Sequence, residues 1–434
     1  MYNQLIHALS GRDEPIQVAI AGCGWDGAGV ARELSRLPGF HVQALIDKDQ
    51  KRIHRVFSDI HSSPDLYALV WNASELRRAQ QCGKAVAFSE IAMIAELENV
   101  DVVFEAIGEV APGLEVAQAA LQSGKHLVTA NCEMDATVGL MLSLQAAEKG
   151  LIYSEADGDQ PAVLARVIAE VRFMGFQPRI VGNCKGFLDY YQTPVGVLPF
   201  VPPGQNPVQL CANADGSKQS IEMTILGNAF GYRPYRRGMF GPRTTKRDLI
   251  RDFGQRMDLN GLTTPVVDYV MGIDGVDQGG GVFVVARRSD EPARSDLRYL
   301  KKGEGPYYLF FRDHHLCYFE SAASIAEAVL FHSAALAPKG RYMEVITMAK
   351  RDIEPGHRLD GIGGFDCYGL AERADTAEGE QCLCQGLAEF ATARTRIPRD
   401  TPITLDMVDL CEEPAVLLKH RQDQLPLETD VRDI

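Results

Sequence analysis

Three glycines within six residues constrain this chain more than any other feature. They are Gly22, Gly24 and Gly27 of the run GCGWDG, between an apolar strand-like run (17–22) and an amphipathic helical pattern. In such a unit the first glycine permits a tight turn, the second lets a diphosphate approach the backbone, and the third allows close helix-to-strand packing. The helix N-terminus supplies free N–H donors for the anion. The run predicts a dinucleotide-binding βαβ unit, and the alternative is a glycine turn without a cofactor.

An acid, Asp47, stands at the end of the next predicted strand, 23 residues after Gly24. A carboxylate there would accept hydrogen bonds from the adenosine ribose and would repel a 2′-phosphate, which favours NAD over NADP. Lys48, Lys51 and Arg52 follow directly and could pair with that phosphate. The expected cofactor is therefore NAD or NADP, with NAD slightly favoured.

Short β-branched runs alternate with helical patterns through residues 1–156, which is typical of an α/β lobe. Strands are expected at 17–22, 41–47, 101–108, 125–131 and 151–156. Helices are expected at 111–122 and 136–148. We predict a Rossmann-type, doubly wound parallel sheet over residues 1–156.

The pattern changes at Pro161, which opens a helical segment and begins a second domain. Mixed helical and strand patterns predict a central α+β domain at 157–340, for substrate binding and oligomerisation. An amphipathic helix at 321–336 belongs either to this domain or to the first lobe. Residues 341–434 show short strands and turns and are expected to form a small β-rich domain.

Composition and charge narrow the class of partner. With 58 acidic and 44 basic residues the chain carries a formal charge of −14, which argues against nucleic acid or an anionic membrane and leaves a small molecule as the expected partner. The first residues lack a signal-peptide pattern, so we expect a cytoplasmic protein. The ten cysteines are scattered and expected to be free. Cys382 and Cys384 lack a second ligand pair, so no metal site is predicted.

Residues at the predicted strand ends should border a nicotinamide, because ligands of open parallel sheets bind at the carboxyl ends of the strands. Ile107 and Gly108 end one strand, and Asn131 ends the next. Within the glycine turn, Trp25 either covers one side of the nicotinamide or anchors the helix, and Asp26 lies beside it.

Two carboxylates follow Asn131 along the chain. Glu133 and Asp135 either orient a polyol substrate or relay a proton, or they are first-turn helix residues that complement the helix dipole.

Several motifs resemble those of a known family. GCGWDG, FEAIG, GKHLVTAN and DGDQP resemble homoserine-dehydrogenase-like oxidoreductases, relatives of the wider Gfo/Idh/MocA group. Four later segments are similar to the subgroup that ends in a SAF domain, the fold of type III antifreeze proteins, and includes deoxyxylulose-phosphate reductoisomerase-like enzymes. These segments are MFGPR (239–243), VVDYVMG (266–272), LKKGEGPYYLFFRDHHL (300–316) and AKRDIEPGHRLDGIGGFDCYG (349–369). The resemblance implies a Rossmann lobe, a central catalytic lobe, a SAF tail and a homo-oligomer.

Two positions differ from that family. Cys132 stands where homoserine dehydrogenases have a lysine, and Phe240 stands where the reductoisomerase-like members have a histidine before Gly-Pro-Arg. A different substrate on the same scaffold is therefore expected.

Hydride transfer between an alcohol and nicotinamide needs a group that exchanges a proton with the substrate oxygen. Lys185 follows a predicted strand where the resemblance places the substrate pocket, and it is the first candidate. His315, in RDHHL, is a second candidate as proton donor or carbonyl polariser.

Three further residues are candidates for the substrate pocket. Lys218 is a catalytic candidate and Glu222 lies one helical turn later, although the two could equally form a surface salt bridge. The planar guanidinium of Arg243 could bind a carboxylate or phosphate of the substrate. The structural alternative is an ion pair between Arg243 and Asp248.

Together these features predict an NAD(P)-dependent oxidoreductase acting on a small polar hydroxy or keto compound, sugar-derived or bearing a phosphate or carboxylate. The alternatives are a reductoisomerase of the deoxyxylulose-phosphate type and a non-catalytic NAD(P)-binding sensor or assembly protein.

Overall fold

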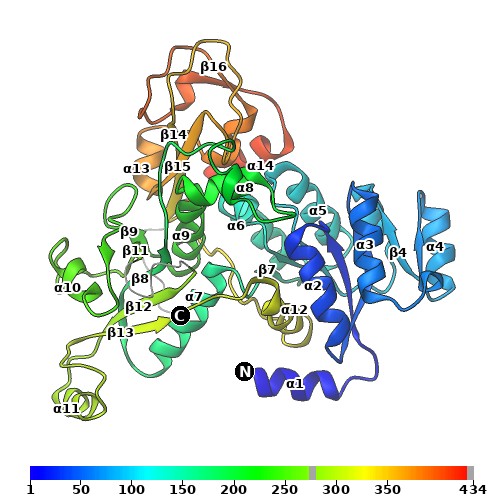
Figure 1. Ribbon diagram of the computed structural model, residues 1–434, viewed down its shortest axis with the longest axis horizontal. Helices are drawn as coiled ribbons and strands as arrows, with labels where there is room; N and C mark the ends of the chain where they lie inside the picture. The colour runs from blue at the N-terminus through cyan, green and yellow to red at the C-terminus, as the bar shows by residue number, and fades with distance from the viewer. Residues whose placement is uncertain (273–279, 428–434) are drawn as a thin grey trace. The chain divides into compact units, whose positions relative to one another are not determined.

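A computed structural model describes residues 1–272 and 280–427 (Figure 1). The chain forms two compact units. The first contains Met1–Asp159, Pro202–Gln205 and Leu316–Ala337, and the second contains Gln160–Val201, Asn206–His315 and the residues from Pro338 onward. The expected boundaries near 156 and 340 stay predictions. No helix in the described ranges is both long and apolar enough to span a bilayer.

The first unit is built on a seven-stranded parallel sheet with the order β3-β4-β2-β1-β5-β6-β7. Its strands are β1 (Ile16–Ala21), β2 (Phe40–Ile46), β3 (Tyr67–Leu69), β4 (Ala85–Phe88), β5 (Val102–Glu105), β6 (His126–Thr129) and β7 (Tyr153–Glu155). The order reverses at β1, which makes the carboxyl ends of β1 and β5 the topological switch point. The predicted doubly wound parallel sheet is confirmed.

Helices cover both faces of this sheet. They are α1 (Tyr2–Ser10), α2 (Trp25–Arg36), α3 (Gln50–Ile60), α4 (Ala73–Gln81), α5 (Val110–Gln122), α6 (Cys132–Glu148) and α12 (Ser321–Leu330). Side chains of α1, α2, α3 and α12 share one apolar cluster with the sheet. Helices α5 and α6 contact each other and β6 but contribute nothing to that cluster, so they lie on the opposite face.

The second unit contains a mixed sheet with the order β10-β11-β8-β12-β13, and β9 pairs with β11. Its strands are β8 (Gln177–Lys185), β9 (Arg233–Pro234), β10 (Arg243–Thr244), β11 (Val266–Gly272), β12 (Val282–Arg287) and β13 (Tyr307–Arg312). Its helices are α7 (Gln160–Phe173), α8 (Pro207–Ala214), α9 (Ser217–Phe230), α10 (Leu249–Gly254) and α11 (Glu291–Tyr299). Helix α10 packs into an apolar cluster on one face. Helices α7 and α9 contact the sheet outside that cluster, on the other face.

The C-terminal residues of the second unit contain two small sheets. These are β14 (Met343–Ala349) with β15 (Cys367–Arg373), and β16 (Ala391–Ala393) with β17 (Val408–Leu410). The expectation of strands and turns alone was wrong, because α13 (Ala374–Gly379) and α14 (Pro414–Asp423) are helical. Pro414 occupies the first turn of α14, where its missing N–H costs no hydrogen bond. The SAF assignment stays a prediction, and residues 428–434 of the predicted domain lie outside the described residues.

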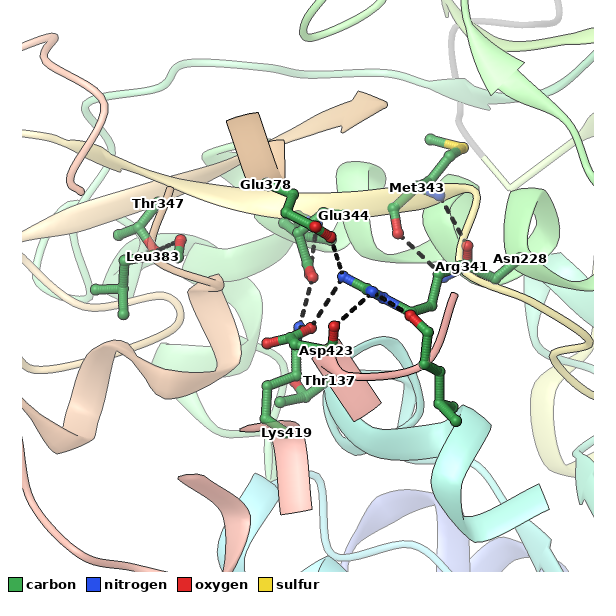
Figure 2. A network of polar contacts seen from close by, with 12 residues as sticks. Thr137, Asn228, Arg341, Met343, Glu344, Thr347, Glu378, Leu383, Lys419 and Asp423 are labelled. Atoms are coloured by element: carbon green, nitrogen blue, oxygen red, sulfur yellow. Dashed lines mark hydrogen bonds and ion pairs between the residues drawn. The ribbon is translucent and has the colours of Figure 1, made fainter. Parts of the chain in front are cut away.

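We call residues 341–427 the C-terminal module, and buried charges attach helix α14 to the rest of it (Figure 2). Lys419 Nζ lies 2.8 Å from Glu344 Oε2 and also pairs with Asp423. Arg341 donates to the carbonyl oxygens of Asp423 and Leu425 at 2.7 and 2.6 Å. Burial alone would lower the pKa of Lys419, but Glu344 and Asp423 raise it above its ordinary value. The ammonium and its carboxylates therefore hold the helix as one charged network.

Candidate functional site

The glycine turn after β1 has three different steric demands. Gly22 adopts φ +93°, and a Cβ there would lie 2.6 Å from the Ala106 carbonyl oxygen. A Cβ on Gly27 would lie 1.8 Å from the Gly22 carbonyl oxygen, so this glycine allows α2 to approach the strand. A Cβ on Gly24 would meet no atom of residues 1–272 and 280–427 within 4 Å. The turn therefore leaves open space over Gly24 at the N-terminus of α2, the geometry that a diphosphate requires.

Asp47 directly follows β2 and is bonded to the same turn. Its Oδ2 accepts the N–H of Cys23 at 2.7 Å, and its Oδ1 accepts the N–H of Asp49 at 2.7 Å. Each carboxylate oxygen keeps a second lone pair that can accept a hydroxyl hydrogen bond. The acid is thus fixed beside the glycine turn and retains the chemistry needed to bind a ribose.

Trp25 and Asp26 form the first turn of α2. The Trp25 ring meets the Tyr318 ring edge-on at a centroid distance of 5.0 Å, and its side chain is 43% exposed. Tyr318 also lies over Gly29 of the same helix, where a Cβ would come within 2.3 Å of its ring. These contacts fit the anchoring interpretation of Trp25 and leave one part of the ring exposed.

A fully buried carboxylate, Glu105, organises the strand ends at the switch point. Its Oε1 accepts the N–H of Ile107 at 2.8 Å and the amide of Asn131 at 3.2 Å, and its Oε2 accepts the Thr129 hydroxyl at 2.7 Å. Asn131 also caps α6 through the N–H of Met134. Of the expected nicotinamide neighbours, Ile107 and Asn131 are therefore held by an acid that the sequence reasoning did not single out.

Gly108 completes this turn with φ +78°, a conformation that favours glycine.

Burial raises the pKa of Glu105 to about 7, although the hydrogen bonds from Thr129 and Ile107 oppose the change. The folded protein therefore binds this proton more tightly than the unfolded chain. Its stabilising contribution is complete below the ordinary value of 4.5 and is lost as the pH rises through about 7. We expect Glu105→Gln to flatten the fall in unfolding free energy over this pH range by on the order of 3 kcal/mol.

Urea titrations at several pH values measure this effect. Glu148→Gln, at an exposed helical position, is the matched control and should leave the pH profile unchanged. An unchanged profile for Glu105→Gln would show that this carboxyl is ionised in the fold.

The two acids at the start of α6 are both buried in the first unit. Asp135 accepts a hydrogen bond from the Tyr153 hydroxyl at 2.7 Å, and burial raises its pKa to about 7 despite that bond. Gly139 leaves room for it, because a Cβ there would lie 1.8 Å from Asp135 Oδ1. Glu133 is 8% exposed in the same turn. Asp135 therefore forms a buried hydrogen-bonded pair with Tyr153.

A cluster that the sequence reasoning missed lies beside them. Cys132 Sγ is 3.0 Å from Glu155 Oε1 and 2.8 Å from Asp159 Oδ2. The sulfur and the two carboxylate oxygens lie within 4.8 Å of one another and could act together as ligands of a cation. The sequence spacing hid this group because Cys132 follows β6, Glu155 ends β7 and Asp159 lies after β7.

The second unit gathers several predicted substrate residues into one polar cluster. Lys185 Nζ lies 3.2 Å from Glu222 Oε2, and the Asn183 amide donates to the same oxygen at 2.7 Å. Asn183 also contacts Gln160 at the start of α7 and Gln219 on α9. Lys185 is 12% and Glu222 is 4% exposed in their side chains, so the ion pair is largely shielded from solvent. We call Lys185, Glu222, Asn183, Gln160 and Gln219 the central polar cluster.

Three members of this cluster were not predicted. Asn183 stands in a strand that otherwise buries apolar side chains, and this was the signal available in the sequence. Gln160 and Gln219 begin two helices, and only the fold brings them to β8.

His315 lies next to the cluster. Its Nδ1 is 2.8 Å from the carbonyl oxygen of Gly280 and 3.5 Å from the Gln160 amide nitrogen. A bond to a carbonyl requires hydrogen on Nδ1, which leaves the Nε2 lone pair of a neutral ring as a proton acceptor. His315 is thus connected to Lys185 by a chain of side-chain contacts through Gln160, Asn183 and Glu222.

Arg243 occupies the same row of the sheet as Lys185. Arg243 on β10 is in register with Met271 on β11, which is in register with Lys185 on β8. Two strand spacings separate the two cationic residues, about 10 Å between backbones. The structure does not show the alternative ion pair between Arg243 and Asp248. Asp248 pairs instead with Arg251, at 2.9 Å.

Lys218 lies in the first turn of α9, one turn before Glu222. Glu222 is buried and bonded to Lys185, so the expectation of an exposed Lys218–Glu222 pair on the helix surface was wrong.

The central part of the chain is similar to a known protein family. Residues 158–321 match the model of the oxidoreductase DRL catalytic domain. This part of the chain is similar to an oxidoreductase catalytic domain. This matched segment contains Lys185, Lys218, Glu222, Arg243 and His315.

A curated homoserine dehydrogenase from Bacillus subtilis (strain 168) is 31% identical over 142 residues, which are 32% of this chain and 29% of that protein. The chain thus matches less than a third of the relative's length. The domain match and this dehydrogenase relative together support an enzyme.

Solved structures with partial similarity include a DOX-P reductoisomerase in complex with NADPH, fosmidomycin and magnesium. It is 15% identical, covers 50% of this chain and 59% of its own, and has a TM-score of 0.35. Another is myo-inositol 2-dehydrogenase from Lactobacillus plantarum, which is 14% identical, covers 64% of this chain and 67% of its own, and has a TM-score of 0.32.

Proposed function

We propose that this protein is an NAD(P)-dependent oxidoreductase that interconverts a small polar alcohol and its carbonyl compound. The observation that carries the proposal is the glycine turn, with open space over Gly24 and a fixed acid, Asp47, beside it. The match of residues 158–321 to an oxidoreductase catalytic domain supports it independently. When bound, the nicotinamide would accept or donate the hydride.

The central polar cluster supplies the proton chemistry in this proposal. In the oxidative direction the substrate hydroxyl gives its proton to Lys185 in the amine form as its carbon loses hydride, and in reduction the ammonium returns the proton to the carbonyl oxygen. Glu222 and Asn183 fix the position of the Lys185 nitrogen by hydrogen bonds. His315 is a second polar contact for the substrate.

Arg243 gives the substrate class in this proposal. Its guanidinium is exposed and lies in the row of Lys185, where a planar fork suits a carboxylate or phosphate. We therefore propose a sugar-derived or other hydroxy compound with one anionic group. Asp47 favours NAD over NADP, because a carboxylate repels a 2′-phosphate.

Gly24→Val tests the cofactor site. The space over Gly24 is open and its backbone is in the ordinary extended region, so valine should fold normally and project into the position of a diphosphate. We expect the affinity for NADH and NADPH to fall roughly tenfold or more in calorimetry, with an unchanged melting temperature. Gly379→Ala, where a Cβ also meets nothing within 4 Å, is the matched control.

If Gly24→Val binds NADH and NADPH as tightly as wild type does, the dinucleotide does not bind at the glycine turn. Tight NADH binding without turnover of any polyol, ketose, aldehyde or keto acid would instead indicate a cofactor sensor. Product analysis of any turnover separates a simple reduction from a reductoisomerase, since only the latter rearranges the carbon skeleton.

A further inference from the structure

A cavity of about 550 Å³ lies in the second unit, formed by residues of the loop after β8 and of the segment between β14 and β15. Its size falls in the range of small-molecule sites, roughly 300 to 1,000 Å³. None of its lining residues belongs to the central polar cluster or to the sequence-predicted site residues. The cavity is therefore made of residues to which the proposed reaction assigns no role.

A buried lysine fixes the shape of this cavity. Lys350 Nζ donates to the carbonyl oxygens of Gln192 and Gly364 at 2.8 and 2.7 Å and to Asp215 Oδ2 at 2.9 Å. All three of its hydrogens are used by the protein. Lys350 thus joins three chain segments and preorganises the walls, but it offers no hydrogen to a ligand.

The carboxylates of the cavity are occupied in the same way. Asp366 Oδ1 accepts from Arg351 Nε at 2.8 Å, and its Oδ2 lies 2.8 Å from His357 Nε2 and accepts the N–H of Asp360 at 3.1 Å. Asp360 accepts the N–H groups of Phe365 and Asp366 at 2.6 and 3.1 Å. Both acids hold the loop in shape. Asp366 uses both lone pairs of each oxygen, whereas each Asp360 oxygen keeps one.

Hydrogen-bond donors, by contrast, remain available. Arg358 donates through Nε to the Glu389 carbonyl oxygen at 3.1 Å, and within residues 1–272 and 280–427 no acceptor is bonded to its two terminal nitrogens. Arg351 uses Nε and Nη2 on Asp366, which leaves its Nη1. Unoccupied guanidinium donors of two arginines, beside an Asp366 carboxylate whose acceptors are filled, are complementary to an anion.

Two aromatic side chains add an apolar surface. Phe365 and Tyr191 line the cavity and are 44% and 41% exposed. Tyr191 is fixed by its hydroxyl, which donates to Asp400 at 2.9 Å, and by the Arg399 guanidinium 3.6 Å from its ring centroid. A fixed tyrosine ring and an exposed phenylalanine ring next to cationic groups favour a ligand that combines a flat ring with a charge.

We propose that this cavity is a second small-molecule site that binds an organic anion, in which a carboxylate or phosphate contacts Arg358 and Arg351 and a planar apolar part packs on Phe365 and Tyr191. The site lies within one unit and stands independently of the proposed redox reaction.

Calorimetric titration of the full-length protein with phenyl phosphate, benzoate and uncharged benzyl alcohol tests the proposal. We expect both anions to bind and benzyl alcohol not to bind, at concentrations up to roughly 10 mM. Arg358→Gln should weaken anion binding about tenfold, and Phe365→Ala should weaken it severalfold. Tighter binding of phenyl phosphate than of benzoate would identify a phosphate ligand, and the reverse a carboxylate.

Arg394→Gln is the matched control, because Arg394 is an exposed arginine of the same module whose partner, Asp409, lies outside the cavity. It should bind both anions like wild type. The proposal is overturned if neither anion binds, if Arg358→Gln binds like wild type, or if binding is lost in Arg243→Gln instead. A circular dichroism spectrum of each variant confirms that the module is folded.

Discussion

Lys185→Met is expected to lower kcat by roughly 10²- to 10⁴-fold while cofactor affinity stays unchanged, because the substitution removes the proton-transfer group and alters no residue of the glycine turn. The assay uses whichever polyol, ketose, aldehyde or keto acid the wild-type protein turns over. Methionine preserves the length of the side chain, and the loss should appear in kcat rather than KM if Lys185 acts mainly in the transition state.

Removal of the ammonium leaves Glu222 buried with Asn183 as a partner, so a stability effect must be separated from the chemical one. The double variant Lys185→Met/Glu222→Gln restores neutrality and should fold like wild type yet remain inactive. Lys149→Met, at an exposed position, is the control and should turn over normally. Turnover near wild type in Lys185→Met, with cofactor affinity unchanged, would remove the lysine from the mechanism.

Lys419→Met is expected to reduce the unfolding free energy of the C-terminal module by about 3–5 kcal/mol. The side chain is 3% exposed, and its loss would leave the Glu344 carboxylate without its cation (Figure 2). Breaking a buried pair by removing one partner costs this much because the remaining charge stays desolvated. Urea unfolding, monitored together with proteolysis near α14, measures the effect.

A second substitution distinguishes lost charge from lost packing. Lys419→Met/Glu344→Gln removes both charges, so it should recover a large part of the stability lost in the single variant. If the double variant is as unstable as the single one, packing of the lysine stem rather than the charge accounts for the effect.

Runs rich in β-branched residues and the spacing of the glycines made much of the first unit predictable. β1, β2 and β5 to β7 follow from β-branched runs, and the spacing of Gly22, Gly24 and Gly27 gave the turn its correct local geometry. β3 and β4 were missed, and their length alone does not explain this, because β7 and β5 are equally short and were predicted.

Side-chain partners were predictable only in part. Lys185 and Glu222 were singled out separately, but their pairing depends on packing α9 against the sheet, which no local pattern encodes. Glu105 was passed over because the strand pattern does not reveal its three donors. These are Thr129, the last residue of β6, and two residues that follow β5 and β6. The role of a buried polar residue is set by its tertiary contacts.

The return of α12 to the first unit has a practical consequence for dissecting the molecule. Ile325, Ala326 and Ala328 of this helix complete the apolar cluster of the dinucleotide-type lobe, although they lie more than 160 residues after its last strand. A fragment ending at Asp159 would expose that cluster to water and be prone to aggregate. A fragment of this lobe must therefore have residues 316–337 joined to residues 1–159, because no continuous segment of the chain contains both.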